Sequence, residues 1–155
     1  MIMNKAAKQT MIFLVAVFMM LCSAGAALTS QQVNAYYKKM DAHNKDLLQI
    51  GKAIRNADDV LLVGNLSDLV NFNMVQLENI EDLQLIESLI ENEADRKRVK
   101  PVISRRIKLV AVGIDGSIRQ LNLYVAHLKS QAVLATAMKV REDLHELKEL
   151  LLSAD

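Results

Sequence analysis

Apolar residues recur along most of this chain at alternating steps of four and three, the spacing that puts side chains on one face of an α-helix. The clearest example lies between residues 103 and 128. Its apolar positions are Ile103, Ile107, Val110, Ile114, Leu121 and Leu128, with Ser117 and Tyr124 at the two gaps. The pattern predicts a single helix of roughly 28 residues, about 42 Å long at about 1.5 Å per residue. Such a helix needs partner helices of similar length to cover its apolar seam.

The first predicted helix begins near Thr29, because Thr29 and Gln32 have the spacing of a capping box. Its apolar positions are Val33, Tyr36, Tyr37, Met40, Leu47, Leu48 and Ile54. We expect this helix to continue through the apolar run at 60–63 and to end at Gly64, since glycine is common just past the end of a helix.

A second helix should begin at an N-cap formed by Asn65 or Ser67 and extend to about Asn92. Its apolar positions are Leu66, Val70, Met74, Leu77, Ile80, Leu83, Ile86 and Ile90. The 103–128 seam then belongs to a third helix that begins between Asn92 and Pro101, because proline suits a first helical turn.

The third helix is expected to end near Lys129, and two glycines at 113 and 116 could interrupt it. A fourth helix opens near Ser130. Its apolar positions are Val133, Ala137, Val140, Leu144, Leu147 and Leu151. Four long amphipathic segments joined by short turns predict an all-α domain over residues 29–153, an up-down-up-down four-helix bundle with coiled-coil-like seams.

The composition agrees with one all-α domain. The chain has 155 residues, of which 52% are hydrophobic and 4% aromatic, with one proline. A sandwich or barrel of many short strands would need more aromatic residues and more turn residues.

The first 26 residues have the layout of a signal peptide. Lys5 and Lys8 precede an uncharged apolar run from Met11 to Cys22, and small residues follow it. The predicted cleavage region consists of Ala24, Gly25, Ala26 and Ala27. Cleavage there would export the domain to the periplasm or the medium and remove the only cysteine, so no disulfide would form. The alternative is an uncleaved membrane anchor, because Met11 to Leu28 approaches the roughly 20 apolar residues of a spanning helix.

Charge is distributed unevenly along the chain. The net charge of +1 gives no strong overall field, so no nucleic-acid partner is expected. Residues 58–95 contain ten acids and no Lys or Arg, whereas residues 96–141 contain eleven bases and one acid. The densest basic group is Arg96, Lys97, Arg98, Lys100, Arg105, Arg106 and Lys108. We expect the acidic helix to lie antiparallel to the basic one; the other hypothesis is a patch that binds an anionic ligand or a partner.

Motifs of catalysis and metal binding are missing from the sequence. There is no G-x-S-x-G and no H-E-x-x-H, and the E-x-x-H pair of Glu142 and His145 has no second copy. Both residues lie off the apolar seam and should face solvent. These observations favour a protein that is not an enzyme and holds no metal or cofactor.

Two short stretches resemble known families. Arg105-Arg106 with the apolar run to Gly113 resembles part of the arginine-bearing helix of the chorismate mutase family, whose pattern has a lysine where this chain has Gly116. Leu28-Thr29-Ser30-Gln31-Gln32 is similar to the L-T-x-x-Q signature of small periplasmic stress chaperones, which carry two copies. The second resemblance implies an all-helical, chaperone-like periplasmic protein.

We therefore expect an exported, non-catalytic protein with a binding or structural role in the cell envelope, acting through a protein partner or self-association. Tyr36 and Tyr37 are adjacent and cannot both face inward, and an exposed tyrosine is a common interface anchor. The alternative is a small anionic ligand held between the last two helices by Arg105, Arg106 or Arg119.

Overall fold

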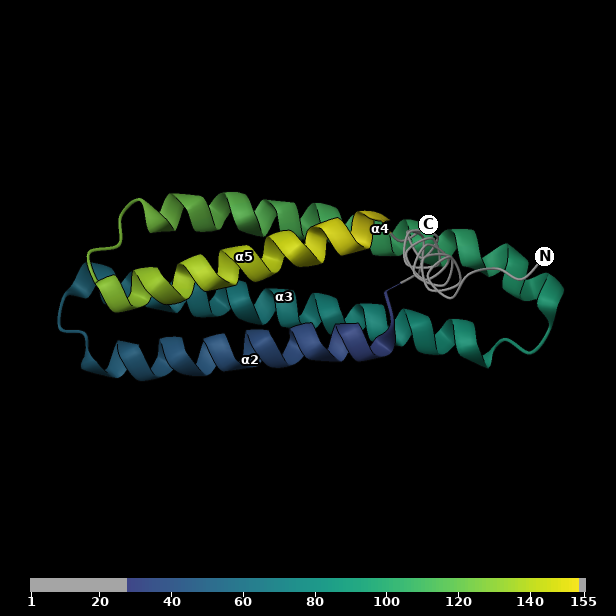
Figure 1. Cartoon of the computed structure of the whole chain (residues 1–155), viewed down its shortest axis with the longest axis horizontal. Helices are drawn as coiled ribbons and strands as arrows, with labels where there is room; N and C mark the ends of the chain where they lie inside the picture. The colour runs from purple at the N-terminus through teal and green to yellow at the C-terminus, as the bar shows by residue number, and fades with distance from the viewer. Residues whose placement is uncertain (1–27, 154–155) are drawn as a thin grey trace, which may run out of the picture.

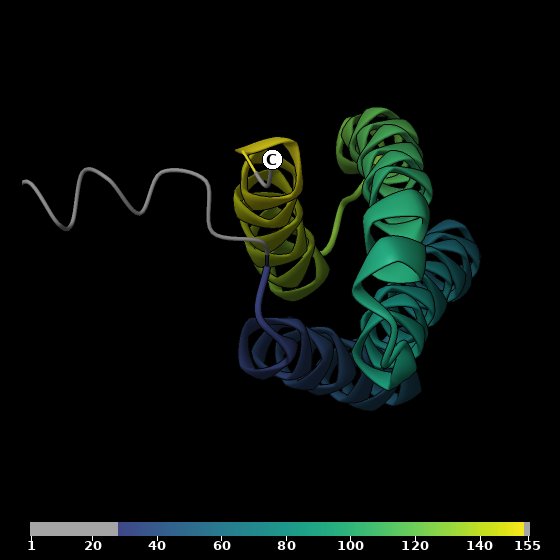
Figure 2. The same cartoon turned by 90° about the vertical axis from the view of Figure 1, so that its right-hand side faces the viewer.

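The computed structural model describes residues 28–153 as four helices: α2 (Ser30–Ala53), α3 (Ala57–Leu89), α4 (Glu93–Val125) and α5 (Gln131–Ser153). Each helix packs against the next, and α2 also packs against α5, so the four helices form a ring (Figures 1 and 2). No strand occurs in the described residues, which confirms the all-α prediction and the four-helix architecture. The predicted signal peptide and its cleavage region at 24–27 lie outside the described residues.

The four predicted seams meet in one core. All six seam residues of α5 are buried, as are most of those on the other three helices. Two predicted core residues are exposed: Leu48 (52%) and Ile86 (51%). Leu47 takes the inward position beside Leu48. Near the end of α3 the inward position belongs to Gln84, whose amide donates to the carbonyl of Leu28.

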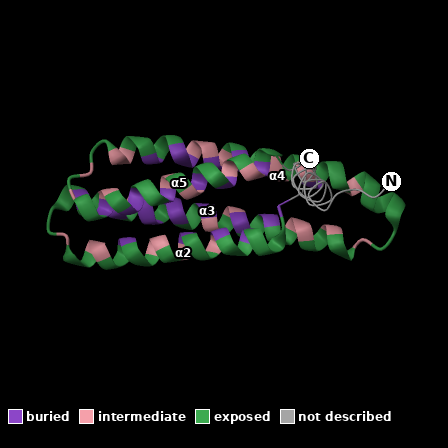
Figure 3. Cartoon of the chain, viewed as in Figure 1, coloured by how far each residue is buried: buried purple, intermediate pink, exposed green. Residues whose placement is uncertain are grey.

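The helices differ in length, and this shapes the molecule. α3 and α4 have 33 residues each, whereas α2 has 24 and α5 has 23. The hairpin formed by α3 and α4 therefore extends past the ends of α2 and α5 (Figure 1). Buried residues gather where four helices overlap, and the projecting hairpin is mostly exposed (Figure 3).

The predicted end of the first helix is wrong. The helix stops at Ala53, residues 54–56 are not helical, and α3 begins at Ala57. The reason is Asn56, whose Oδ1 accepts the backbone N–H of Asp58 at 2.9 Å and caps α3. Asp58 and Asp59 in the first turn complement the positive end of the helix dipole.

The residues expected to stop or cap a helix at that point lie inside α3 instead. A side chain at Gly64 would meet nothing within 4 Å, so packing does not require a glycine there. Asn65 and Ser67 are also interior, and Ser67 donates its hydroxyl to Asn44 of α2 at 2.6 Å.

The start of α4 also differs from the sequence expectation. Asn92 caps the helix by accepting the N–H of Ala94 at 2.8 Å, which places Pro101 well inside the helix rather than in its first turn. A proline there has no N–H for the carbonyl of Lys97, four residues earlier. The helix continues unbroken through both glycines, 113 and 116, and ends at Val125.

The expected neighbourhood of the acidic and basic segments is confirmed. The acidic segment forms α3 and the most basic stretch forms the first half of α4, and these two helices pack side by side. Their antiparallel arrangement follows from the short connection at 90–92.

Candidate functional site

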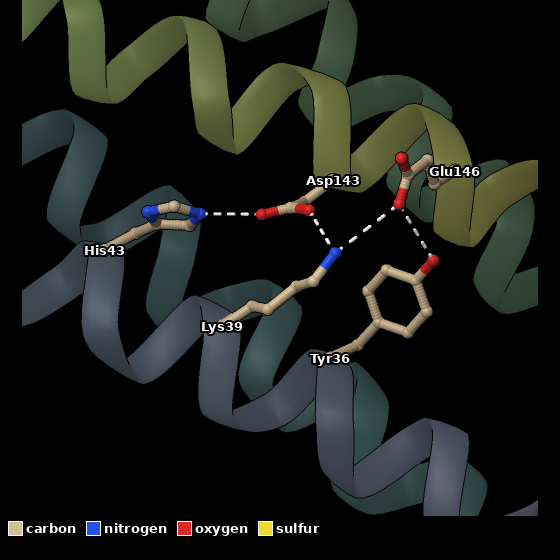
Figure 4. A network of polar contacts seen from close by, with 5 residues as sticks. All are labelled: Tyr36, Lys39, His43, Asp143 and Glu146. Carbon is tan, nitrogen blue, oxygen red and sulfur yellow. Dashed lines mark hydrogen bonds and ion pairs between the residues drawn. The ribbon is translucent and has the colours of Figure 1, made fainter.

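A polar network of five residues lies between α2 and α5 (Figure 4). His43 Nε2 lies 2.7 Å from Asp143 Oδ2, and Lys39 Nζ lies 2.6 Å from Asp143 Oδ1. Glu146 Oε2 accepts from Lys39 at 3.4 Å and from the Tyr36 hydroxyl at 3.2 Å. The network therefore joins the two helices that close the ring.

The charged groups of this network lie beside groups of opposite charge or beside hydrogen-bond partners. The hydrogen bond that Lys39 donates to Asp143 raises the pKa of Lys39, whose ammonium lies 4.9 Å from the centre of the Tyr36 ring. Burial, with the adjacent Glu146 carboxylate, raises the pKa of Tyr36. Within residues 28–153, no serine, threonine or cysteine side chain hydrogen-bonds to His43. The arrangement fits a link between helices.

Sequence reasoning missed this network. The three residues on α2 are spaced by three and four, at 36, 39 and 43, and their partners on α5 are spaced by three, at 143 and 146. Such polar positions beside an apolar seam are the signal that could have found it.

The structure separates the predicted interface tyrosines. Tyr36 is 8% exposed and points into the network, whereas Tyr37 is half-buried beside α3. The hydrogen bond that the Tyr37 hydroxyl donates to the Glu78 carboxylate raises the pKa of Tyr37. The two tyrosines therefore face different neighbours, and Tyr37 alone retains an accessible part.

Thr29 and Gln32, which carry the resemblance to the stress chaperones, form a capping box. The Gln32 N–H donates to Thr29 Oγ1 at 3.2 Å, and the Thr29 N–H donates to Gln32 Oε1 at 2.8 Å. Their role in this structure is to begin α2.

The predicted basic patch lies along the first half of α4. Its first residues have local contacts: Lys97 pairs with Glu93 at 2.9 Å, and Arg98 lies 3.9 Å from Asp95. Arg96 donates to the carbonyl of Ile90 at 2.6 Å. Lys100 is exposed and Lys108 is half-buried.

The three arginines proposed for an anionic ligand do not converge. Arg106 lines a hollow between α3 and α4 together with the Asp82 carboxylate. Arg119 pairs with Asp115 at 2.7 Å. Arg105 and Arg119 are 14 residues apart on one continuous helix, which is about 21 Å at about 1.5 Å per residue.

The described residues offer no metal cluster. Among residues 28–153, no group of three or more His, Cys, Asp or Glu side chains is placed to hold a metal ion. Glu142 and His145 are both exposed, as their position off the seam predicts.

A second apolar surface lies on the outward side of α3 and α4, and we call it the outer face. Eleven of the fourteen large apolar residues that are exposed lie on these two helices, so the exposure is concentrated rather than scattered. Nine of them make up the apolar part of the outer face: Leu61, Phe72, Val75, Ile86 and Leu89 on α3, and Val102, Leu109, Val112 and Leu123 on α4.

The outer face follows a second four-three series on each helix. On α3 the series is 61, 65, 68, 72, 75, 79, 82, 86 and 89, and on α4 it is 98, 102, 105, 109, 112, 116, 119 and 123. These positions alternate steps of four and three, as the buried seams do. Sequence reasoning did not find these two series because it followed only the stronger seam on each helix.

The polar residues of the two series differ in sign. Asp68 and Asp82 are the acids on α3, and Arg98, Arg105 and Arg119 are the bases on α4. The face is thus apolar along its length, with acids on one helix and bases on the other.

Hollows lie along the outer face between the two helices. Phe72 lines one of them with Gly113 and Gly116, and a side chain built on either glycine would meet nothing within 4 Å. Leu83 and Leu109 line another with Asp82 and Arg106. The surface is therefore grooved as well as apolar.

The two apolar faces explain the composition of α3. An 18-residue window of this helix has a mean hydropathy of 1.2. By length and composition alone, the helix is therefore long and apolar enough to cross a membrane. Only 39% of that window is buried inside the bundle. A helix that is apolar on more than one side normally has more than one apolar neighbour.

We found no match to this chain among protein-family models, curated proteins or solved structures.

Proposed function

We propose that this chain is an exported, non-catalytic helical bundle that serves a binding or structural role in the cell envelope by docking a protein partner on the outer face of α3 and α4. The export part of the proposal rests on the layout of residues 1–27: a basic start, an apolar run and a small-residue cleavage region.

The observation that supports the docking part is the exposed apolar series on two neighbouring helices. Apolar surface costs about 25 cal/mol for each Å² left in water. Soluble monomers rarely expose apolar patches larger than a few hundred Å², and larger ones usually mark interaction sites. Long helices also present the extended grooves that protein partners occupy.

The test is mild crosslinking in the native envelope, followed by purification and intact mass analysis. We expect a reproducible protein neighbour, and we expect its yield to fall at least tenfold with Val75→Asp or Leu109→Asp. The matched control is Leu48→Asp on α2, because Leu48 is as exposed as these two residues but lies off the outer face.

Two outcomes would contradict the proposal. One is a stoichiometric small acid, metal or haem in the purified protein with no protein neighbour. The other is an equal loss of crosslinking in all three variants, which would mean that the outer face has no special part in binding.

A further inference from the structure

We infer that the occupant of the outer face is a second copy of this chain, related by a two-fold axis parallel to the helices, so that α3 of each protomer lies against α4 of the other. This inference rests on the proposed function, because it names the partner of the same surface. Three features of the outer face support it: its charge pattern, the positions of its charged residues along the helices, and its length.

Charge complementarity selects a second copy over an unrelated apolar partner. A surface that docks on its own copy must be self-complementary. On the outer face, α3 presents the acids Asp68 and Asp82, and α4 presents the bases Arg105 and Arg119. A two-fold axis parallel to the helices places α3 opposite the partner's α4, so each of the two acids meets a base, and Arg98, the third base of the α4 series, comes level with Leu89 near the tip of the hairpin.

The charged residues also lie at matching levels along the helices. Asp82 lines the same hollow as Arg106, beside Arg105. Asp68 lines the same hollow as Gln120, beside Arg119. Rotation about an axis parallel to the helices leaves every level unchanged. Asp82 would therefore come level with Arg105 of the second copy, and Asp68 level with its Arg119.

Three further pairs of positions in the two series would then have no polar side chain, whereas Asn65, Asn79 and Arg98 keep the other pairs partly polar. Phe72 and Val75 on α3 come level with Gly116 and Val112 of the second copy, since Phe72 and Gly116 line one hollow. Ile86 comes level with Val102 by the same register. A large side chain opposite a glycine is the knob-and-hole arrangement that close helix packing needs.

The length of the face is sufficient for a stable dimer. The two 33-residue helices are each about 50 Å long at about 1.5 Å per residue. A pair of helices about 10 Å apart presents a strip about 20 Å wide. Such a strip exceeds the roughly 800 Å² per partner of an ordinary specific interface.

A lipid surface fits the outer face less well. Asp68 and Asp82 stand in the middle of the apolar series on α3, and acids within a hydrocarbon phase are strongly disfavoured. Against a second copy the same acids would gain arginine partners. Arg119 already pairs with Asp115 on its own helix and would share its guanidinium between the two carboxylates.

The first experiment measures mass against concentration, by sedimentation equilibrium, for the protein as its own cell processes it. We expect a dimer. Val75→Asp and Leu109→Asp should each weaken the dimer at least tenfold, because each would bring an unpaired carboxylate into the interface. Leu48→Asp should leave the dissociation constant unchanged. Circular dichroism of each variant separates loss of the dimer from loss of the fold.

The second experiment tests the pairing of α3 with α4 of the other copy. Asp82→Arg alone should be monomeric, because two arginines then meet at each contact, and Arg105→Asp alone should be monomeric because two acids meet. A mixture of the two variants should form a one-to-one heterodimer, in which every contact again joins an acid and a base. A mixture that stays monomeric while both variants remain folded would overturn the proposed arrangement.

The failure of this inference differs from the failure of the proposed function. A monomeric wild type that still captures another protein, with capture lost in Val75→Asp, would overturn the second copy and leave the docking proposal standing. A monomer that binds vesicles of anionic lipid through the same residues, and captures no protein, would overturn both.

Discussion

At the scale of single residues, buried and paired polar groups distinguish this bundle from a purely apolar one. Lys148 of α5 donates to Asp115 of α4 at 2.6 Å, and Arg119 lies 2.7 Å from the same carboxylate. The hydrogen bond from Lys148 holds the pKa of Asp115 below its ordinary value of 3.8. This aspartate therefore links folding stability to pH.

The sign of that linkage gives the first residue-scale prediction. Because the folded-state pKa of Asp115 is lowered, its carboxylate stabilises the fold above pH 3.8, and the stabilisation is lost as pH falls through the lower, folded-state pKa. Asp115→Asn should therefore be less stable than the wild type at pH 7, and the difference should shrink below pH 3.8. Urea unfolding of both proteins across this range measures it. A difference that stays constant with pH would contradict the assignment.

Residue-scale features were the hardest to predict from sequence. Asn73 is fully buried in α3, donates to the carbonyl of Leu69 at 2.7 Å, and leaves its Oδ1 without a partner among the described residues. Position 73 belongs to the buried four-three series 66, 70, 73, 77 and 80, but a polar residue there is not recognised by a search for apolar residues. The same holds for the pairing of His43 with Asp143, which are 100 positions apart.

At the scale of helices, the four-three spacing predicted which residues are buried, whereas single glycine, proline and cap residues predicted the helix boundaries badly. Every predicted seam position of α5 is buried as its four-three spacing indicates, since one face of a helix can contact the core. Gly64 was a misleading stop signal because the cap at Asn56 begins a new helix that passes through it. The outer face was missed although its series was in the sequence, because acids and arginines interrupt its apolar residues.

Pro101 provides the prediction at this scale. It lies in the interior of α4 on the exposed hairpin, where it removes a backbone hydrogen bond to Lys97. Pro101→Ala should raise the free energy of unfolding by about 1–3 kcal/mol. Urea denaturation measures this change, with Lys100→Ala as the control that should stay within about 0.5 kcal/mol of the wild type. A destabilised Pro101→Ala would mean that the proline is needed for the bend or packing of α4.

At the scale of the whole molecule, the overall architecture followed from the sequence and the function did not. Four amphipathic stretches with short connections have few ways to bury their seams together, so the ring of four helices was predictable. The outer face was not predictable, because the periodicity of a helix shows that a side is apolar but does not show whether another helix covers that side. The outer face lies on the exposed sides of α3 and α4, away from the core that the four helices share.

Export yields a prediction at this scale. Protein recovered from its native compartment should begin near Ala27, since the small residues at 24 and 26 fit a cleavage site. Intact mass spectrometry with N-terminal sequencing checks this. A chain that retains Met1 and sediments with membranes would support the anchored alternative instead. Replacing Ala24 and Ala26 with bulky residues should block the processing of an exported chain.

The burial of Leu28 has a consequence for the order of events in time. Leu28 is packed into the core, Gln84 donates to its carbonyl, and the capping box that starts α2 follows at Thr29. A protease needs an extended, accessible stretch on both sides of the bond it cuts. If the chain is cut near Ala27, the residues that follow this bond would be inaccessible to the protease once the bundle has folded. Processing would then have to precede the docking of α2, and a chain that folded first would keep its leader.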